Sequence, residues 1–287
     1  MPNRYINRAI AAIWSEEAGR VRRVLDLSVG EGDTSRILSG KGFEVVATEY
    51  LAPPVLGPSI LRLGGVNLND PLPFKDNTFD GVNLVEVIEH VEHQPQLIRE
   101  IGRVLKAGGV VVISTPNVLN MFSRLRFLFT GFLRGRIRPL HYQHKPGIAH
   151  NIYLIHFYEL YYLLFHYGFD IAQLRKTRVK LTSPLFAVFF YPFMWLFSLF
   201  SIIFPEKDPV QRRINWQILR SFLKSPLLFS DNIVVKARKH GREVALDPAP
   251  EKWRAGRGGS LISDKTMGLR QSMDRESQGR TGLVFGV

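Results

Sequence analysis

The stretch VLDLSVGEGDTSRIL, residues 24–38, decides the fold. Its first residues, VLDLS, are rich in Val and Leu, as is typical of a strand buried on both faces of a parallel sheet. Its last residues have the pattern of the start of a helix. Gly30 and Gly32 lie between the two, where glycine lets the backbone turn tightly and approach a ligand that a side chain would exclude. The stretch therefore predicts a nucleotide- or nucleoside-binding turn, although a plain strand-to-helix turn looks similar.

A carboxylate at the end of the next apolar run supports the ligand-binding interpretation. Glu49 directly follows the run EVVAT (44–48) and lies 17 residues after Gly32. At that place a carboxylate can accept hydrogen bonds from both hydroxyls of a ribose. A nicotinamide-dependent enzyme would use a similar arrangement, so the spacing alone leaves the ligand open.

Apolar runs and helical patterns alternate along the rest of the chain. Repeated strand and helix units of this kind imply a parallel, doubly wound sheet. The predicted class is α/β: a Rossmann-like, seven-stranded, doubly wound sheet with helices on both faces and an apolar insertion before the last strand. The predicted strands are 24–28, 44–48, 80–85, 110–114, 169–175 and 231–239, and the predicted helices are 3–18, 33–41, 95–106, 156–168 and 209–224.

The glycine loop resembles the first motif of the class I S-adenosylmethionine (SAM)-dependent methyltransferases, which runs hydrophobic, hydrophobic, Asp, x, Gly, x, Gly, x, Gly. The chain reads V-L-D-L-S-V-G-E-G, so that Asp26, Gly30 and Gly32 match and Ser28 replaces the first glycine. The resemblance implies that these four residues and Glu49 bind SAM.

The resemblance continues through NLNDPLPFKDNTFDGVNLVEVIEHVEHQPQLIREIGRVLKAGGVVVISTPN, residues 67–117. It implies that Asn67 and Leu68 lie beside the adenine, where the family usually has an aspartate. An asparagine can still accept a hydrogen bond from the adenine amine through its carbonyl oxygen. A nicotinamide-dependent enzyme does not explain the PLPF, EVIEH and LKAGG blocks in this order, so the methyltransferase interpretation is favoured.

Candidate catalytic residues follow the fourth predicted strand. His90 lies at the carboxyl edge of the sheet, where it could accept the proton of a hydroxyl acceptor, although a histidine there can also simply cap or pack the next helix. Glu89 and His150 complete the expected catalytic set. Glu86, Glu89, His90 and His150 also resemble the Mg²⁺ ligands of small-RNA 2′-O-methyltransferases, but EVIEH equally resembles quinone-precursor and sugar-modifying methyltransferases.

Residues 185–204, LFAVFFYPFMWLFSLFSIIF, carry no charge, and nine of the 20 are aromatic. The length would span a bilayer. However, the strands on either side should share one sheet, so both ends must stay on one side of a membrane, and Pro192 would kink a straight helix. An in-plane or re-entrant membrane anchor fits best, and an aromatic dimer interface or core helix is the alternative.

The positive charge of the chain is concentrated around this segment. Residues 1–120 hold 12 Lys/Arg and 14 Asp/Glu, residues 121–240 hold 18 and 5, and residues 241–287 hold 8 and 6. A local excess of this kind indicates an anionic partner, which is a phospholipid surface or a nucleic acid. RNA is the weaker choice because the basic segment lacks an obvious base-stacking module.

These observations divide the chain into five parts: an N-terminal helix (1–20), a SAM-binding core (21–180), an apolar and basic membrane-associating insertion (181–230), a last strand (231–240) and a disordered tail (241–287). The first 20 residues lack a continuous apolar run, so no secretory signal is expected and the enzyme should lie on the cytoplasmic face of a membrane. The layout resembles methyltransferases of bacterial polysaccharide gene clusters, which implies a lipid-linked sugar acceptor. A quinone precursor, an RNA ribose and a catalytically inactive binding subunit remain the alternatives.

Overall fold

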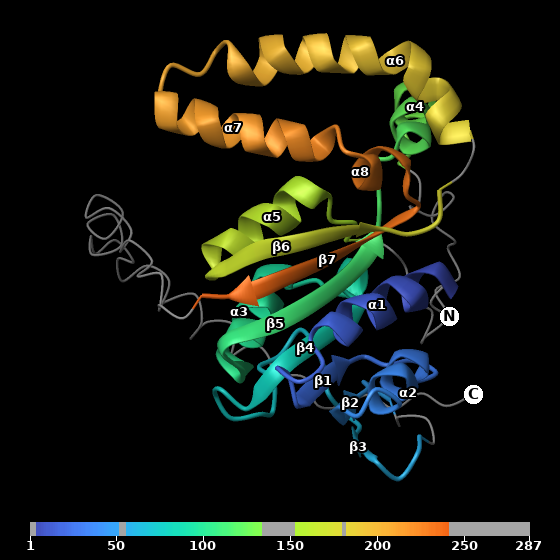
Figure 1. The fold of residues 1–287 in the computed structure, drawn as a ribbon, viewed down its shortest axis with the longest axis vertical. Coiled ribbons are helices and arrows are strands. Elements are labelled where there is room, and N and C mark those ends of the chain that lie inside the picture. The colour runs from blue at the N-terminus through green and yellow to red at the C-terminus, as the bar shows by residue number, and fades with distance from the viewer. Residues whose placement is uncertain (1–3, 52–55, 134–152, 180–181, 241–287) are drawn as a thin grey trace, which may run out of the picture. The chain divides into compact units, whose positions relative to one another are not determined.

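The computed structural model describes residues 4–51, 56–133, 153–179 and 182–240, all within one compact unit, Met1–Val244 (Figure 1). Its centre is a seven-stranded sheet with the strand order β3-β2-β1-β4-β5-β7-β6. The strands are β1 (Arg23–Leu27), β2 (Glu44–Thr48), β3 (Ile60–Leu63), β4 (Phe79–Val85), β5 (Leu105–Pro116), β6 (Phe169–Lys176) and β7 (Asn232–Lys239). The predicted seven-stranded α/β fold is confirmed.

The last strand departs from the expected parallel sheet. The pairs β1–β2, β1–β4, β2–β3 and β4–β5 are parallel, whereas β7 runs antiparallel to both β5 and β6. A strand that returns between two neighbours must reverse direction unless a crossover carries it back to the other edge. The carboxyl ends of β1, β2, β4, β5 and β6 therefore meet at one edge of the sheet, and the start of β7 lies at that same edge.

Helices cover both faces of the sheet, as predicted. Helix α1 (Arg4–Glu16) and helix α2 (Asp33–Ser39) bury Ile10, Trp14 and Leu38 in one apolar cluster. Helix α3 (Gln94–Val104) and helix α5 (Phe157–His166) contribute to a second cluster on the other face, together with β4 and β5. Apolar residues on one stripe of each helix and on both faces of the strands account for the two clusters.

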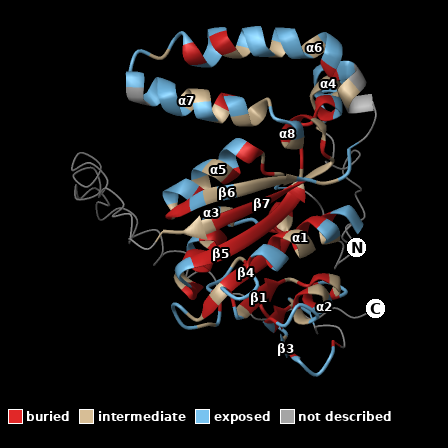
Figure 2. Cartoon of the chain, viewed as in Figure 1, coloured by how far each residue is buried: buried red, intermediate tan, exposed pale blue. Residues whose placement is uncertain are grey.

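The predicted apolar insertion is helical. Helix α6 (Thr182–Ser198) continues into a π-helical turn, η2 (Leu199–Ile203), and helices α7 (Pro209–Phe222) and α8 (Ser225–Phe229) lead back to β7. A further helix, α4 (Met121–Thr130), which the sequence patterns do not predict, follows β5. Figure 2 shows that α6 is largely exposed, whereas the central strands β4, β5 and β7 are mostly buried. The predicted disordered tail, 241–287, lies outside the described residues.

Candidate cofactor and acceptor site

The glycine loop between β1 and α2 has the left-handed backbone that its sequence requires. Ser28, Gly30 and Gly32 have φ values of 53°, 54° and 80°. A Cβ at Gly32 would lie 2.2 Å from Cδ2 of Leu56, so the Leu56 side chain would have to shift, and the φ of 80° disfavours any residue other than glycine. At Gly30 a Cβ would meet no atom within 4 Å, so this part of the loop faces open space. Serine bears the left-handed conformation at a modest cost, of the order of 1 kcal/mol.

The carboxylate of Glu49 lies across this loop. It accepts hydrogen bonds from the backbone N–H of Gly30 at 2.8 Å, from the N–H of Tyr50 at 2.9 Å and from the hydroxyl of Ser28 at 3.3 Å. Parallel pairing of β1 with β2 brings the two strand ends together. The structure therefore brings together Ser28, Gly30 and Glu49, which the sequence analysis assigned to one cofactor site.

The structure places Asp26 beneath the loop. Its buried carboxylate accepts hydrogen bonds from Thr34 Oγ1 at 2.9 Å, Ser35 Oγ at 2.6 Å and Asn83 Nδ2 at 2.7 Å. The indole N–H of Trp14 donates to Asn83 Oδ1 at 3.1 Å, so the network joins α1, α2, β1 and β4. Burial raises the pKa of Asp26, and the three hydrogen bonds oppose that rise.

The loop proposed to contact adenine lies beside Glu49, since Val66 N–H donates to the Glu49 carbonyl at 3.1 Å. Asn67 bonds within this loop: its Oδ1 accepts from Asn69 N–H at 3.1 Å and its Nδ2 donates to Asp70 at 2.9 Å. Leu68 is buried. The adenine contacts of Asn67 and Leu68 stay predictions, and adenine would have to compete with Asn69 for the Asn67 oxygen.

Two glutamates follow β4, of which Glu89 is buried and Glu86 is half-buried. Glu86, in a left-handed conformation with φ 55°, accepts hydrogen bonds from Ser114 Oγ at 2.7 Å and from Asn232 Nδ2 at 2.6 Å. Glu89 accepts from Thr115 Oγ1 at 3.1 Å. The ends of β5 and β7 thus hold both carboxyl groups. These hydrogen-bond donors were not predicted from the sequence, although the polar residues that end the apolar run of β5 could have indicated them.

Burial dominates the ionisation of this pair. Burial and, after it, the negative charge of Glu86 together raise the pKa of Glu89 to about 8. Burial also raises the pKa of Glu86, against the hydrogen bonds from Ser114 and Asn232. Two carboxyl groups that are desolvated side by side do not both ionise at neutral pH, so the pair holds a proton there.

The candidate histidines are only partly accounted for. His90 ends a short 3-10 turn, η1 (Ile88–His90), is half-buried, and donates its backbone N–H to Val87 O at 2.9 Å. His150 lies outside the described residues. Within the described ranges no three His, Cys, Asp or Glu side chains are grouped to hold a metal ion, so the Mg²⁺ interpretation of Glu86, Glu89 and His90 gains no support.

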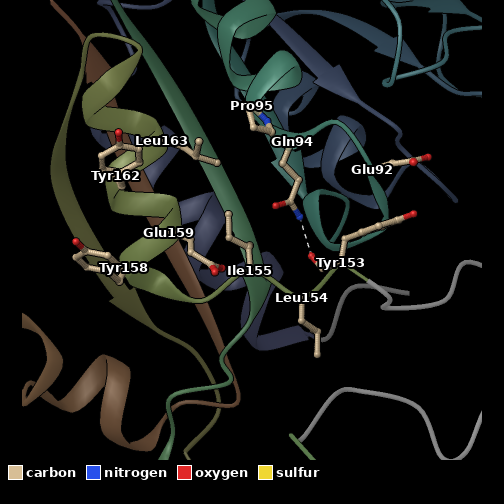
Figure 3. A pocket seen from close by; sticks show the side chains of 10 residues that line it. All are labelled: Glu92, Gln94, Pro95, Tyr153, Leu154, Ile155, Tyr158, Glu159, Tyr162 and Leu163. Carbon is tan, nitrogen blue, oxygen red and sulfur yellow. Dashed lines mark hydrogen bonds between the residues drawn. The ribbon is translucent and has the colours of Figure 1, made fainter. Parts of the chain in front are cut away.

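An open cleft of about 410 Å³ lies outside the η1 turn, between α5 and the start of α3 (Figure 3). Gln94 Nε2 joins its two sides by donating to Tyr153 O at 2.7 Å and to Ile88 O at 2.9 Å. Tyr153 N–H donates in turn to the Glu89 carbonyl at 3.2 Å. The lining side chains include three tyrosines and two carboxylates, Tyr153, Tyr158, Tyr162, Glu92 and Glu159.

The comparison with known families agrees with this geometry. A family described as "Methyltransferase domain" matches residues 2–174, which is more than half of the chain. The chain belongs to this family. The class I methyltransferase resemblance of the glycine loop and of residues 67–117 is thereby confirmed.

Curated relatives of this methyltransferase include two with names from quinone biosynthesis. Demethylmenaquinone methyltransferase from Clavibacter sepedonicus is 34% identical over 121 residues, which are 39% of this chain and 46% of the relative. Ubiquinone biosynthesis O-methyltransferase from Xanthomonas oryzae pv. oryzae is 32% identical over 106 residues, which are 33% of this chain and 43% of the relative. The chain spans less than half the length of these two relatives.

A solved SAM-dependent methyltransferase from Methanosarcina mazei has the same fold. It superposes with a TM-score of 0.50 and 17% sequence identity, covering 80% of this chain and 98% of the solved one. The glycine loop of the present methyltransferase fits SAM on its own geometry. It combines an open face at Gly30, left-handed residues on either side, and the Glu49 carboxylate next to its N–H groups.

Proposed function

We propose that this methyltransferase transfers the methyl group of SAM to a hydroxyl of an acceptor presented at a membrane, such as a lipid-linked sugar. One observation carries the proposal: the glycine loop crossed by Glu49 and the pair Glu86 and Glu89 share one edge of the sheet. In open α/β sheets ligands bind at this edge. The cofactor and the acceptor can therefore meet between the ends of β1 and β4.

SAM, when bound, supplies a methyl group on a sulfonium, which is already a good leaving group. The residues of the chain then contribute mainly positioning, which can remove roughly 7 to 11 kcal/mol of a barrier. Gly30, Ser28 and Glu49 would hold the cofactor, and Asp26 would fix the loop from below. As the acceptor oxygen forms its bond to the methyl carbon, His90 would take the hydroxyl proton. Glu89 directly precedes His90 in the sequence.

Two features support an acceptor that is both polyhydroxylated and membrane-borne. The cleft outside η1 offers tyrosine rings and hydroxyls together with the carboxylates of Glu92 and Glu159. Such amphipathic side chains can pack on a sugar and hydrogen-bond to its hydroxyls. The apolar insertion supplies the reason to expect a lipid-linked form. A quinone precursor is the second candidate, favoured by the names of the two quinone-biosynthesis relatives.

Calorimetry with S-adenosylhomocysteine tests the cofactor site. Glu49→Ala should weaken binding by removing the acceptor for the ribose hydroxyls. Glu44→Ala is the matched control, because Glu44 is exposed at the opposite end of β2, where it pairs with Arg22. Preferential binding of a nicotinamide dinucleotide, or equal affinity in both variants, would overturn the assignment.

Transfer of tritium from labelled SAM tests the acceptor. The full chain is incubated with a lipid-linked sugar fraction, a quinone-precursor phenol, or RNA, and the label is followed into each. His90→Ala should lower turnover while leaving S-adenosylhomocysteine affinity unchanged. The control variant His93→Ala should not lower turnover. Label in the phenol or the RNA alone would replace the sugar, and cofactor binding without transfer to any acceptor would mean an inactive binding subunit.

A further inference from the structure

Two helices that contact each other present large apolar side chains to solvent. On α4, Leu128 and Phe129 are 69% and 78% exposed, and on α6, Val188 and Phe189 are 74% and 68% exposed. The helices pack against each other, and Arg124 Nη1 on α4 lies 3.9 Å from Met194 Sδ on α6. The apolar surface is defined by Phe127, Leu128 and Phe129 on α4, by Val188, Phe189, Phe193, Trp195 and Phe197 on α6, and by Phe200 on η2, which continues α6.

This surface is not the core of a soluble domain. The window Phe186–Ile203 has a mean hydropathy of 2.0, yet only 17% of it is buried. A core helix of that composition would be mostly buried, and monomeric soluble proteins rarely expose apolar patches larger than a few hundred Å². The surface therefore needs a partner that covers α4 and α6 together.

The topology fits a contact with a membrane surface and not a membrane crossing. β6 and β7, which precede and follow the insertion, pair in one sheet, so the chain must return to the side from which it left. The returning helix α7 carries Arg212, Arg213 and Arg220, which are costly within the hydrocarbon. α7 instead packs under the end of α6, where Leu199 and Ile203 of η2 meet Leu219.

Charge complementarity selects an anionic bilayer. Lys207 and Arg213 are exposed where the chain turns from η2 into α7, and the Arg220 guanidinium lies over the Trp216 ring, 5.9 Å from its centroid. Each basic side chain close to anionic headgroups strengthens the attraction to such a bilayer. Aromatic side chains at the acyl boundary with lysine and arginine among the headgroups are the arrangement of in-plane anchors.

We propose that α4 and α6 together form a docking surface for an anionic phospholipid bilayer. Including α4 extends the proposed function. The significance of α4 for catalysis rests on that function. α4 begins six residues after Thr115, and the link is fixed: Asn117 Nδ2 donates to Leu227 O at 2.9 Å, and Asn120 Oδ1 caps α4 by accepting from Ser123 N–H at 2.9 Å. In Figure 1 the chain passes directly from the end of β5 into α4. Docking thus brings lipid next to the acceptor side of the site.

Co-sedimentation of the full chain with vesicles tests the surface. Vesicles of phosphatidylcholine mixed with phosphatidylglycerol should bind the protein more strongly than phosphatidylcholine alone, and salt should weaken the difference. The α6 variant Phe193→Ser/Trp195→Ser/Phe197→Ser and the α4 variant Leu128→Ser/Phe129→Ser should each bind at least about tenfold less, because each loses buried apolar area. Leu61→Ser on β3 is the matched control, since Leu61 is 63% exposed at the far edge of the sheet.

The outcomes separate this proposal from the proposed function. All variants should bind S-adenosylhomocysteine as the wild type does, because the surface shares no residue with the glycine loop. Full vesicle binding by the α4 variant would remove α4 from the surface. A wild type that ignores vesicles, and forms dimers that the α6 substitutions dissociate, would make the surface an interface between two copies.

Discussion

Replacing Glu89 by glutamine should change how the stability of the protein depends on pH. Burial and the negative charge of Glu86 raise the pKa of Glu89 to about 8, from an ordinary value of 4.5. Between these two values the folded protein keeps a proton on Glu89 that the unfolded chain has lost. The folded state binds more protons there, so the free energy of unfolding falls as pH rises and levels off above about pH 8.

The magnitude follows from the length of that window. Each pH unit between the two pKa values removes about 1.4 kcal/mol, so the step from about pH 6 to pH 7.5 should cost the wild type on the order of 2 kcal/mol. Glutamine keeps an oxygen that can accept from Thr115 Oγ1 and cannot ionise. The Glu89→Gln variant should therefore lose much less stability over the same step.

Urea unfolding at several pH values measures the slope directly. Glu44→Gln serves as the control, because the Glu44 side chain is 53% exposed on the opposite edge of the sheet and its loss should leave the slope unchanged. Desolvation also raises the pKa of Glu86, which contributes with the same sign, so a residual slope in Glu89→Gln is expected. Equal slopes in the wild type and in Glu89→Gln would refute the idea that the pair holds a proton at neutral pH.

Two further predictions concern the support of the glycine loop. Trp14→Phe leaves the buried Asn83 Oδ1 without its donor and should lower the free energy of unfolding by about 1 to 3 kcal/mol, as measured by urea unfolding. Gly32→Ala places a Cβ 2.2 Å from Leu56 Cδ2 at φ 80°, so it should weaken S-adenosylhomocysteine binding in calorimetry; unchanged affinity would show that the loop adapts.

The sequence predicted what depends on local pattern. Runs of apolar residues located β1, β2, β4 and β5, and the glycine spacing located the loop, because each follows from neighbours within a few positions. The role of Glu49 could be predicted because one helix and one strand separate it from the loop. These residues do meet, through hydrogen bonds at Gly30 and Ser28.

What the sequence did not predict depends on contacts between distant segments. Trp14 reads as one apolar position of an amphipathic helix, and only the fold brings its N–H to Asn83, 69 residues away. Asn232 looks like an ordinary start of a strand, and only the antiparallel entry of β7 brings it to Glu86. β3 is too short to show a period, and α4 lies in a stretch where aromatic residues and arginine alternate without a clear stripe.

Asn232 makes hydrogen bonds both at the base of the insertion and on the acceptor side of the site. At the base of the insertion, Thr177 Oγ1 donates to Asn232 O at 2.6 Å and accepts from Asn232 N–H at 3.1 Å, which closes the segment between β6 and β7. The side chain of Asn232 instead donates a hydrogen bond to Glu86 at 2.6 Å. A shift at the base of the insertion would therefore move a hydrogen bond to the carboxyl pair, and that bond acts to lower the pKa of Glu86. Under the proposal that α4 and α6 dock on a bilayer, this connection would link docking to the carboxyl pair.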